Sequence, residues 1–314
     1  MPDSGSKPPR RSWLARSTCA SVAFSIAQAV APAANAQGSE NEAAPRLEWR
    51  QEWPRFRTWE YAATGVSLAG LATIVLFASR PEEASEYGNP FDASVRKALR
   101  AETRASRDDA RFVGDAGFRF LNIYPYVDSL VVAGLVHWNS DVALQMTLID
   151  TQAFAMAGFV SIGFERLLGR ARPSARECRN KPDYERFCGA DDAYSSLMSG
   201  HTAIAFAGAG LTCAHHTHLP LYGSRAADIS ACLVTVGMAA ASGVARVVND
   251  RHWASDIVLA ASVGGVSGYL LPVWLHYGSN DAGRPRESGG QGLNFAVLPE
   301  LGPERAAVRI VLVN

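Results

Sequence analysis

Residues 199–219 read SGHTAIAFAGAGLTCAHHTHL, a short polar opening followed by a long run of alanine, glycine and other apolar residues. Ser199, Gly200 and His201 would stand at the first turn of a buried helix, which puts an imidazole beside free backbone N–H groups. Helix N-termini bind phosphate because these unpaired N–H groups and the helix dipole both favour an anion. The stretch therefore predicts a helix over 200–219 with an anion site at its mouth.

A second polar cluster follows about fifty residues later, where residues 245–256 read ARVVNDRHWASD. His252 and Asp256 are four residues apart, so they share one face of a helix start. Asp256 can accept a hydrogen bond from the protonated ring nitrogen of His252, which would leave the other ring nitrogen free as a nucleophile. Arg246 can bind a phosphate group through both arms of its guanidinium.

Together the clusters predict a phosphotransfer site that uses two histidines and needs no metal. His252 would attack phosphorus, and His201 would protonate the departing oxygen. Taken singly, such a histidine is often only a helix cap, and an arginine at a segment end is often an interface anchor. The residues expected to hold the phosphate oxygens are Arg172, Ser199, Gly200 and Arg246.

Six apolar segments predict an all-α membrane bundle. The first segment, from Glu60 to Ser79, carries no charge after Glu60 and is long enough to cross a hydrocarbon core of about 30 Å. Interleaved Trp and Arg residues just before it are typical of an anchor at the membrane interface. The later segments are rich in small residues, which lets helices approach closely in lipid; a soluble helical bundle is the alternative. Asp128 and Asp150 inside them either serve function or join helices by hydrogen bonds. The later segments are 121–138, 142–165, 200–219, 227–247 and 254–275.

The clusters resemble the three-part signature of the type-2 phosphatidic-acid phosphatase superfamily, which also includes bacterial acid phosphatases and vanadium haloperoxidases. That signature is Lys-x6-Arg-Pro, then Pro-Ser-Gly-His, then Ser-Arg-x5-His-x3-Asp. The resemblance spans roughly residues 58–276 and points to the integral-membrane branch. It implies a covalent phosphohistidine on His252, with His201 as the general acid. The matching residues are Arg172, Pro173, Ser199, Gly200, His201, Arg246, His252 and Asp256.

Three positions depart from this pattern. Glu165 stands where the family has lysine, and a glutamate facing phosphate would repel it. Arg166 is adjacent but points roughly 100° away on a helix, so either it swings in or the site is weakened. Met198 replaces the proline, and Ala245 replaces the serine, which removes one hydroxyl donor. Because the nucleophile and both arginines remain, we favour an active enzyme.

The chain divides into four parts. The leader has a basic start, a weakly apolar middle and the small-residue site Ala34-Asn35-Ala36, which predicts a secretory signal or else an uncut leader. Near the end, a glycine-rich linker precedes alternating apolar residues around Gly302-Pro303, which predict a short β-hairpin-like tail. The parts are a signal-like leader (1–36), a juxtamembrane segment (37–57), the helical phosphatase domain (58–276) and the linker with its tail (277–314).

Cysteine and histidine positions leave two questions open. Cys178 and Cys188 flank a short polar loop and either close it as a disulfide in an oxidising compartment or stay separate thiols. His215, His216 and His218 could ligate a metal, but at a segment end they more often belong to a solvated loop. Since no Cys/His zinc spacing occurs, we predict no metal and no cofactor.

Charge restricts the partners and the orientation. Thirty basic and 30 acidic side chains leave no net charge, which argues against nucleic acid and leaves the membrane and a lipid phosphate as expected partners. Arg46, Arg50, Arg55 and Arg57 precede the first segment. By the positive-inside rule, this places the N-terminal end on the cytoplasmic side of a bacterial-type inner membrane and the site on the outer side, facing the periplasm. A cleaved leader would put the mature N-terminus outside and the site inside. Either the leader is not a signal, or one apolar segment, 121–138 being the weakest, does not cross, or the bundle does not span; we keep the outward-facing site.

The sequence thus predicts a multi-pass membrane phosphatase that hydrolyses a phosphomonoester or diphosphate of a lipid, either phosphatidate-like or polyprenyl diphosphate. A site at the mouth of a helical bundle would admit an acyl chain sideways while the phosphate stays at the polar rim. Glu165 motivates one alternative, a non-catalytic membrane protein of the same fold that binds anionic lipid. A vanadate-dependent haloperoxidase, with His252 ligating vanadium, is a third hypothesis.

Overall fold

The computed structural model describes residues 47–83, 87–188, 191–278, 294–301 and 306–313. The leader (1–36) and most of the linker lie outside the described residues. The elements in chain order are α1 (Thr58–Phe77), α2 (Pro90–Leu99), α3 (Arg104–Tyr126), the π-helical η2 (Val127–Val136), α4 (Ser140–Leu167), α5 (Ala175–Asn180), α6 (Gly200–His218), α7 (Arg225–Val248), α8 (Ala254–Gly265), the π-helical η3 (Val266–Leu270) and η4 (Val273–Tyr277), β1 (Asn294–Leu301) and β2 (Ala306–Val313).

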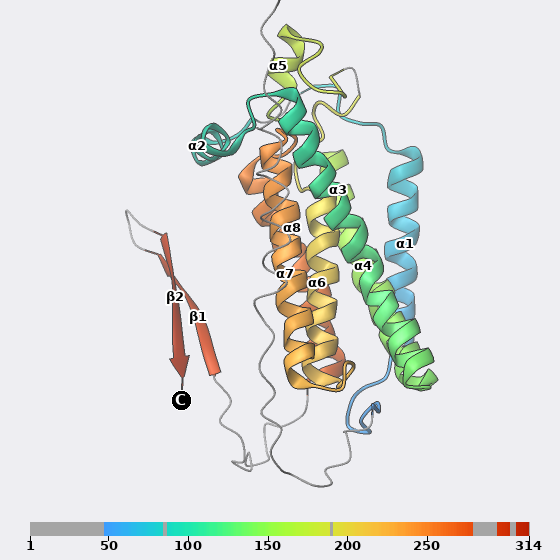
Figure 1. Ribbon diagram of the computed structural model, residues 1–314. Coiled ribbons are helices and arrows are strands. Elements are labelled where there is room, and N and C mark those ends of the chain that lie inside the picture. The colour runs from blue at the N-terminus through green and yellow to red at the C-terminus, as the bar shows by residue number, and fades with distance from the viewer. Residues whose placement is uncertain (1–46, 84–86, 189–190, 279–293, 302–305, 314) are drawn as a thin grey trace, which may run out of the picture. The chain divides into compact units, whose positions relative to one another are not determined.

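Helix α6 is the centre of the bundle and packs against α3, α4, α7 and α8, which run beside it in Figure 1. Glycines make this close approach possible. A Cβ on Gly208 of α6 would overlap the Leu121 carbonyl of α3, and a Cβ on Gly264 of α8 would overlap the Ala203 carbonyl of α6. Small residues therefore set the helix spacing, as they do where lipid gives helices no hydrophobic reason to associate.

Buried polar residues join the end of α6 to its neighbours. His215 Nε2 lies 2.8 Å from Asp150 of α4. His216 lies between Asp228 of α7, at 2.7 Å from Nδ1, and Asp128 of η2, at 3.2 Å from Nε2. These two histidines are buried among helices, so the expectation of a solvated loop was wrong for them, and Asp128 and Asp150 hold helices together.

Helix α1 is apolar on its outer face and polar on its inner one. Glu60 and Thr64 are buried, whereas Leu76 and Phe77 are 72% and 81% exposed. An exposed apolar face of this kind suits lipid and not water. Four of the described helices are long and apolar enough to cross a membrane: Thr58–Phe77, Ser140–Leu167, Arg225–Val248 and Ala254–Tyr277.

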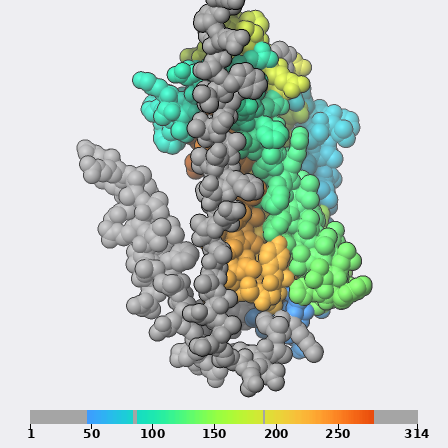
Figure 2. Space-filling model, in the orientation of Figure 1, coloured from blue at the N-terminus to red at the C-terminus, as the bar shows by residue number. Residues whose placement is uncertain are grey.

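The two other expected crossings have different surroundings. Helix α6 is enclosed by protein, so alanine and glycine are sufficient there and its hydropathy is low. The segment 121–138 begins inside α3, whose first half is charged, and continues through η2. In Figure 2 the green surface of α3 and α4 lies beside the orange surface of α7, so these helices form part of the outer face. Six crossings therefore stay a prediction.

The segment before α1 and the two C-terminal strands complete the described chain. Trp49 and Trp53, expected as interface anchors, are 7% and 4% exposed and pack against Tyr277. β1 pairs antiparallel with β2, from Asn294 opposite Val313 onward. Because the residues that would join these strands lie outside the described part of the chain, the hairpin tail stays a prediction.

Candidate active site

His252 stands in the turn between α7 and α8, and its side chain is 3% exposed. Its Nδ1 lies 2.9 Å from the backbone carbonyl of Ser196. A carbonyl oxygen can only accept, so Nδ1 carries the proton and donates it. Nε2 keeps its lone pair and lies 3.4 Å from a terminal guanidinium nitrogen of Arg172. The surroundings therefore present one unprotonated ring nitrogen.

Asp256, expected to orient His252 directly, lies beside the ring without a hydrogen bond to it, because the Oδ2–Nδ1 distance is 3.9 Å. Its carboxylate accepts from the Ser196 hydroxyl at 2.7 Å and from the Trp253 backbone N–H at 2.9 Å, and it pairs with buried Arg170. Asp256 therefore fixes the Ser196 segment, whose carbonyl in turn orients the imidazole. The sequence analysis missed both Arg170 and Ser196, which no motif marks.

A chain of buried ion pairs ties α2 to this site. Arg170 donates to Asp92 of α2 at 2.7 Å and to the Ser255 hydroxyl at 2.9 Å. Arg96 of α2 donates twice to Asp250, each time at 2.7 Å. Asp92 and Asp250 are fully buried, so these bonds offset the cost of removing their charge from water. The turn that carries His252 is thereby held from two sides.

Arg172 is buried beside His252 and is held by the loop that follows α5. Its Nε donates to the Asp192 carbonyl at 2.7 Å, and one Nη lies 3.3 Å from the Asp192 carboxylate. Another Nη donates to the Arg251 carbonyl at 3.0 Å. Burial, with the neighbouring Arg251 charge, lowers the pKa of Arg172 to about 10, so the guanidinium stays protonated at neutral pH.

His201 and Arg246 share one carboxylate that the sequence analysis missed. Asp115 of α3 lies 3.4 Å from His201 Nε2 and 3.2 Å from an Nη of Arg246. The hydrogen bond to His201, with the Arg246 charge, lowers the pKa of Asp115 to about 2. Arg246 is 6% exposed, and its Nε has no hydrogen-bond partner among the described residues. A bound anion would supply that partner.

The mouth of α6 differs in part from expectation. Gly200 lines the cavity described next, but the Ser199 hydroxyl accepts from the Thr202 backbone N–H at 3.4 Å and from its hydroxyl at 3.1 Å. Ser199 is therefore the helix cap, buried and away from the cavity lining. Met198 has a φ of 61°, which proline, fixed near −65°, cannot adopt. The departure from the family's proline thus matches a different backbone.

Both histidines line one cavity of about 540 Å³ between α3, α4, α6 and the loops above them. Its described lining holds more positive than negative charge, because the carboxylates are only Glu165 and Asp192. Phe118, Ile162 and Ile204 make part of the wall apolar. The arginines of the lining are Arg80, Arg111, Arg166, Arg172, Arg246 and Arg251.

Glu165, the residue in the lysine position, faces this cavity. Its carboxylate lies 3.8 Å from an Nη of Arg172. Arg166 does not replace the lysine near His252, since its guanidinium donates to the Ala78 carbonyl at 2.8 Å. Arg251, a residue that the sequence analysis did not select, lies close enough to Arg172 to disfavour its charge. The positive charge near His252 is thus supplied in part by Arg251, the residue directly before it.

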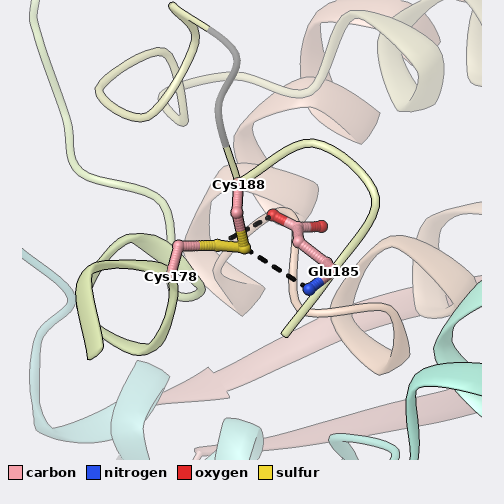
Figure 3. Close-up of side chains that lie close together, drawn as sticks. All are labelled: Cys178, Glu185 and Cys188. Atoms are coloured by element: carbon pink, nitrogen blue, oxygen red, sulfur yellow. Dashed lines mark hydrogen bonds between the residues drawn. A yellow bond between two sulfur atoms is a disulfide. The ribbon is translucent and has the colours of Figure 1, made fainter. Parts of the chain in front are cut away.

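A disulfide between Cys178 and Cys188 closes the polar loop beside the cavity (Figure 3). Glu185 projects into this loop, accepts from the Ser174 hydroxyl at 2.8 Å and pairs with Arg251 at 3.0 Å. The two sulfurs lie near the Glu185 carboxylate, but bonded to each other they offer no thiolate to a metal. The loop therefore serves to hold Arg251. A second disulfide, which the sequence analysis did not pair, joins α6 and α7 through Cys213 and Cys232.

Comparison with known proteins agrees with this geometry. The family model of the PAP2 superfamily matches residues 151–279, which hold His201, Arg246, His252 and Asp256. Over 127 residues the chain is 38% identical to a lipid A 1-phosphatase of Porphyromonas gingivalis, a match that covers 40% of this chain and 23% of that relative. The chain thus spans only about a quarter of the relative's length. No solved structure matches the chain. Residues 151–279 thus resemble the PAP2 superfamily, and both histidines and the arginines of its signature within that stretch line one cavity.

Proposed function

We propose that this protein is a membrane phosphatase that hydrolyses a phosphomonoester or diphosphate of a lipid through a phosphohistidine on His252. The observation that carries the proposal is the orientation of the His252 ring. The Ser196 carbonyl takes the Nδ1 proton, so the lone pair of Nε2 is available beside Arg172 in a cavity rich in arginine. The PAP2 match and the relative named lipid A 1-phosphatase support a lipid-linked phosphate as the substrate.

In the first step, Nε2 of His252 forms a bond to phosphorus while the bond from phosphorus to the leaving oxygen breaks. His201 gives its proton to that oxygen, and Asp115 beside the ring stabilises the charged imidazolium before the transfer. Arg172 and Arg246 hold the equatorial oxygens, whose charge shifts in the transition state. The unpaired Nε of Arg246 would gain its missing partner from one of these oxygens.

In the second step, water attacks the phosphohistidine. His201 is now neutral and takes a proton from that water as the new P–O bond forms. The P–N bond breaks, its electron pair returns to Nε2 of His252, and inorganic phosphate leaves. We propose that no metal is needed, because the guanidinium groups of the cavity supply the positive charge that a metal would bring.

The cavity wall favours a lipid over a soluble phosphate ester. Val75 of α1, Phe118 of α3 and Ile162 of α4 line the same cavity as the arginines. α1 exposes an apolar face along most of its length, so a lipid could reach the cavity from the bilayer while its phosphate stays at the polar end. The chemical class of the lipid beyond its phosphate stays open between a monoester and a diphosphate.

We propose that the active site faces the periplasm of a bacterial inner membrane. The Cys178–Cys188 disulfide stands at the same end of the bundle as His252, whereas the Cys213–Cys232 disulfide joins α6 and α7 farther along the bundle, so the orientation rests on the charges before α1. The arginines before α1 agree with this orientation under the positive-inside rule.

Phosphate release from a panel of lipid phosphates tests the proposal. We expect the detergent-solubilised protein to turn over at least one lipid in the presence of a chelator, and His252→Ala to lower the rate on the order of 10⁴-fold or more. His137→Ala, an exposed histidine at the turn before α4, is the matched control and should keep the native rate. Full activity in His252→Ala would overturn the mechanism.

Glu165 favours one second candidate, an anionic-lipid-binding protein without turnover. Its carboxylate lies 3.8 Å from an Nη of Arg172, where it competes with phosphate for the same guanidinium. Turnover that appears only in Glu165→Lys would support this candidate. Turnover by the native protein would exclude it.

A further inference from the structure

A second cavity, of about 460 Å³, lies between α2, α5 and the Trp253 indole, and the mechanism does not use it. Arg172 lines this cavity as well as the catalytic one. We call it the α2–α5 cavity. Its described lining holds one carboxylate, that of Glu177. Its cationic side chains are Arg96, Lys97, Arg100, Arg172 and Arg176.

Protein carboxylates balance only part of this charge. Arg96 is bonded to Asp250, and it shares Glu177 with Arg100, at 3.4 and 3.3 Å. Lys97 and Arg176 are exposed, and neither has a carboxylate within ion-pair distance in the described part of the chain. Among the described residues, Lys97 and Arg176 therefore keep their charge available to an anion.

The floor of the cavity is rigid and adjoins the nucleophile. The Gly88 backbone lies directly over the Trp253 indole, where a Cβ would come within 2.6 Å of the ring. The Arg176 guanidinium stacks over Tyr87 at 4.6 Å from the ring centroid. Since Trp253 follows His252 directly, a group bound here would stand next to the residue that attacks phosphorus.

The exposed residues of α2 indicate which class of anion can reach the cavity. Phe91 and Leu99, near the two ends of α2, are 57% and 43% exposed, so this short helix leaves apolar side chains uncovered, whereas Asp92 is fully buried. A short helix with exposed apolar side chains and basic residues beside them is typical of the membrane interface, at the depth of lipid headgroups. The anions that such a cavity meets are therefore headgroup phosphates and carboxylates.

We propose that the α2–α5 cavity binds a second anionic group on the headgroup of the same lipid whose phosphate occupies the catalytic cavity. This rests on the proposed function, because it takes the catalytic cavity to hold a lipid phosphate. Arg172, shared by the two cavities, would contact both anions. The protein then prefers a headgroup with two anionic groups over a headgroup with one.

Two lipids with the same acyl chains test the preference. Dioleoyl phosphatidate carries one phosphate, and dioleoyl phosphatidylglycerol phosphate carries a terminal phosphomonoester and a second, internal phosphate. We expect kcat/KM of the full-length native protein to be about tenfold higher for the two-phosphate lipid, as charge-assisted contacts of two cations would give. In the double variant Lys97→Gln with Arg176→Gln, the ratio should fall to within about twofold of one.

A matched control removes one lysine charge and one arginine charge at positions outside the α2–α5 cavity. Lys181→Gln with Arg179→Gln also changes one exposed lysine and one exposed arginine, on or directly after α5, but neither lines the α2–α5 cavity. This control should keep the native ratio. A native protein without a preference, or a preference kept by the Lys97 and Arg176 variant, would overturn the proposal. Inorganic phosphate or anionic lipid added in trans that accelerates phosphatidate turnover to the two-phosphate rate would overturn it too, since the cavity would then take a separate anion.

Binding to the His252→Ala protein separates this inference from the proposed function. If native protein hydrolyses no lipid of the panel, the proposed function fails. Tighter binding of the two-phosphate lipid to His252→Ala, lost when Lys97→Gln and Arg176→Gln are added, would still support the second site. Equal binding of both lipids would overturn it.

Discussion

At the scale of single residues, the environment of His252 determines how activity should depend on pH. Burial, and next the Arg172 charge, lower the pKa of His252 well below its ordinary 6.5. A base with a lowered pKa stays neutral until the pH falls through that lower value, so the nucleophile is lost only in acid. We expect kcat/KM on a lipid phosphate, which reports the free enzyme, not to decline as the pH falls through 6.5, and to decline only at lower pH. A decline centred at 6.5 or above would contradict this.

Glu165 supports a second prediction at this scale. Because its carboxylate faces the cavity proposed to hold phosphate, Glu165→Gln should remove a repulsion between the carboxylate and phosphate while it keeps the shape of the side chain. We expect the inhibition constant of inorganic phosphate to fall roughly five- to tenfold, the size of one partly screened charge interaction. Glu102→Gln, a change at an exposed glutamate, should leave the constant unchanged. A rise for Glu165→Gln would show that the carboxylate helps to hold Arg172.

The candidate site residues that belong to sequence motifs could be predicted, because the spacing between them along the chain is characteristic. His252, His201, Arg172 and Arg246 are brought to one cavity, as their motifs predicted. Asp115 was not predictable, because it reaches the two groups it contacts from a distant helix. The same holds for other ion-pair partners that only tertiary packing supplies: Asp92, Arg170 and Asp192.

At the scale of elements, the contact between α6 and α8 depends on one glycine and not on its neighbour. A Cβ on Gly264 would overlap the α6 backbone, whereas a Cβ on Gly265 would meet nothing within 4 Å. Gly264→Ala should therefore cost about 1–3 kcal/mol of stability, the usual cost of overpacking, and Gly265→Ala should not destabilise the protein. Thermal unfolding in detergent measures both. Equal unfolding temperatures would contradict the close packing.

The elements show why hydropathy predicts some helices well and others poorly. The expected helix at 200–219 agrees with α6, because a glycine–histidine start and an apolar run define both ends. The expected segment at 121–138 was displaced, because α3 begins seventeen residues earlier in charged sequence. Charges at 104–119 face the loops and cavities at one end of the bundle, a tertiary fact that a local pattern cannot show.

At the scale of the whole molecule, the two disulfides should have separable effects. Cys178→Ser with Cys188→Ser frees the loop that holds Glu185 against Arg251, so we expect KM to rise about tenfold. The matched pair Cys213→Ser with Cys232→Ser should lower stability by about 2–4 kcal/mol and leave KM unchanged. Steady-state kinetics and thermal unfolding distinguish the two. Equal KM changes would contradict a role of the loop in the site.

The carboxylates that hold His215 and His216 also have a consequence for biogenesis. Helix α6 cannot partition into lipid alone, since two buried imidazoles need Asp150, Asp128 and Asp228 from three other elements. The translocon should therefore retain α6 until α7 has been synthesised, so that the central helix of the bundle would be among the last to insert into the membrane. In a chain truncated before Asp228, α6 should be left accessible to water-soluble reagents.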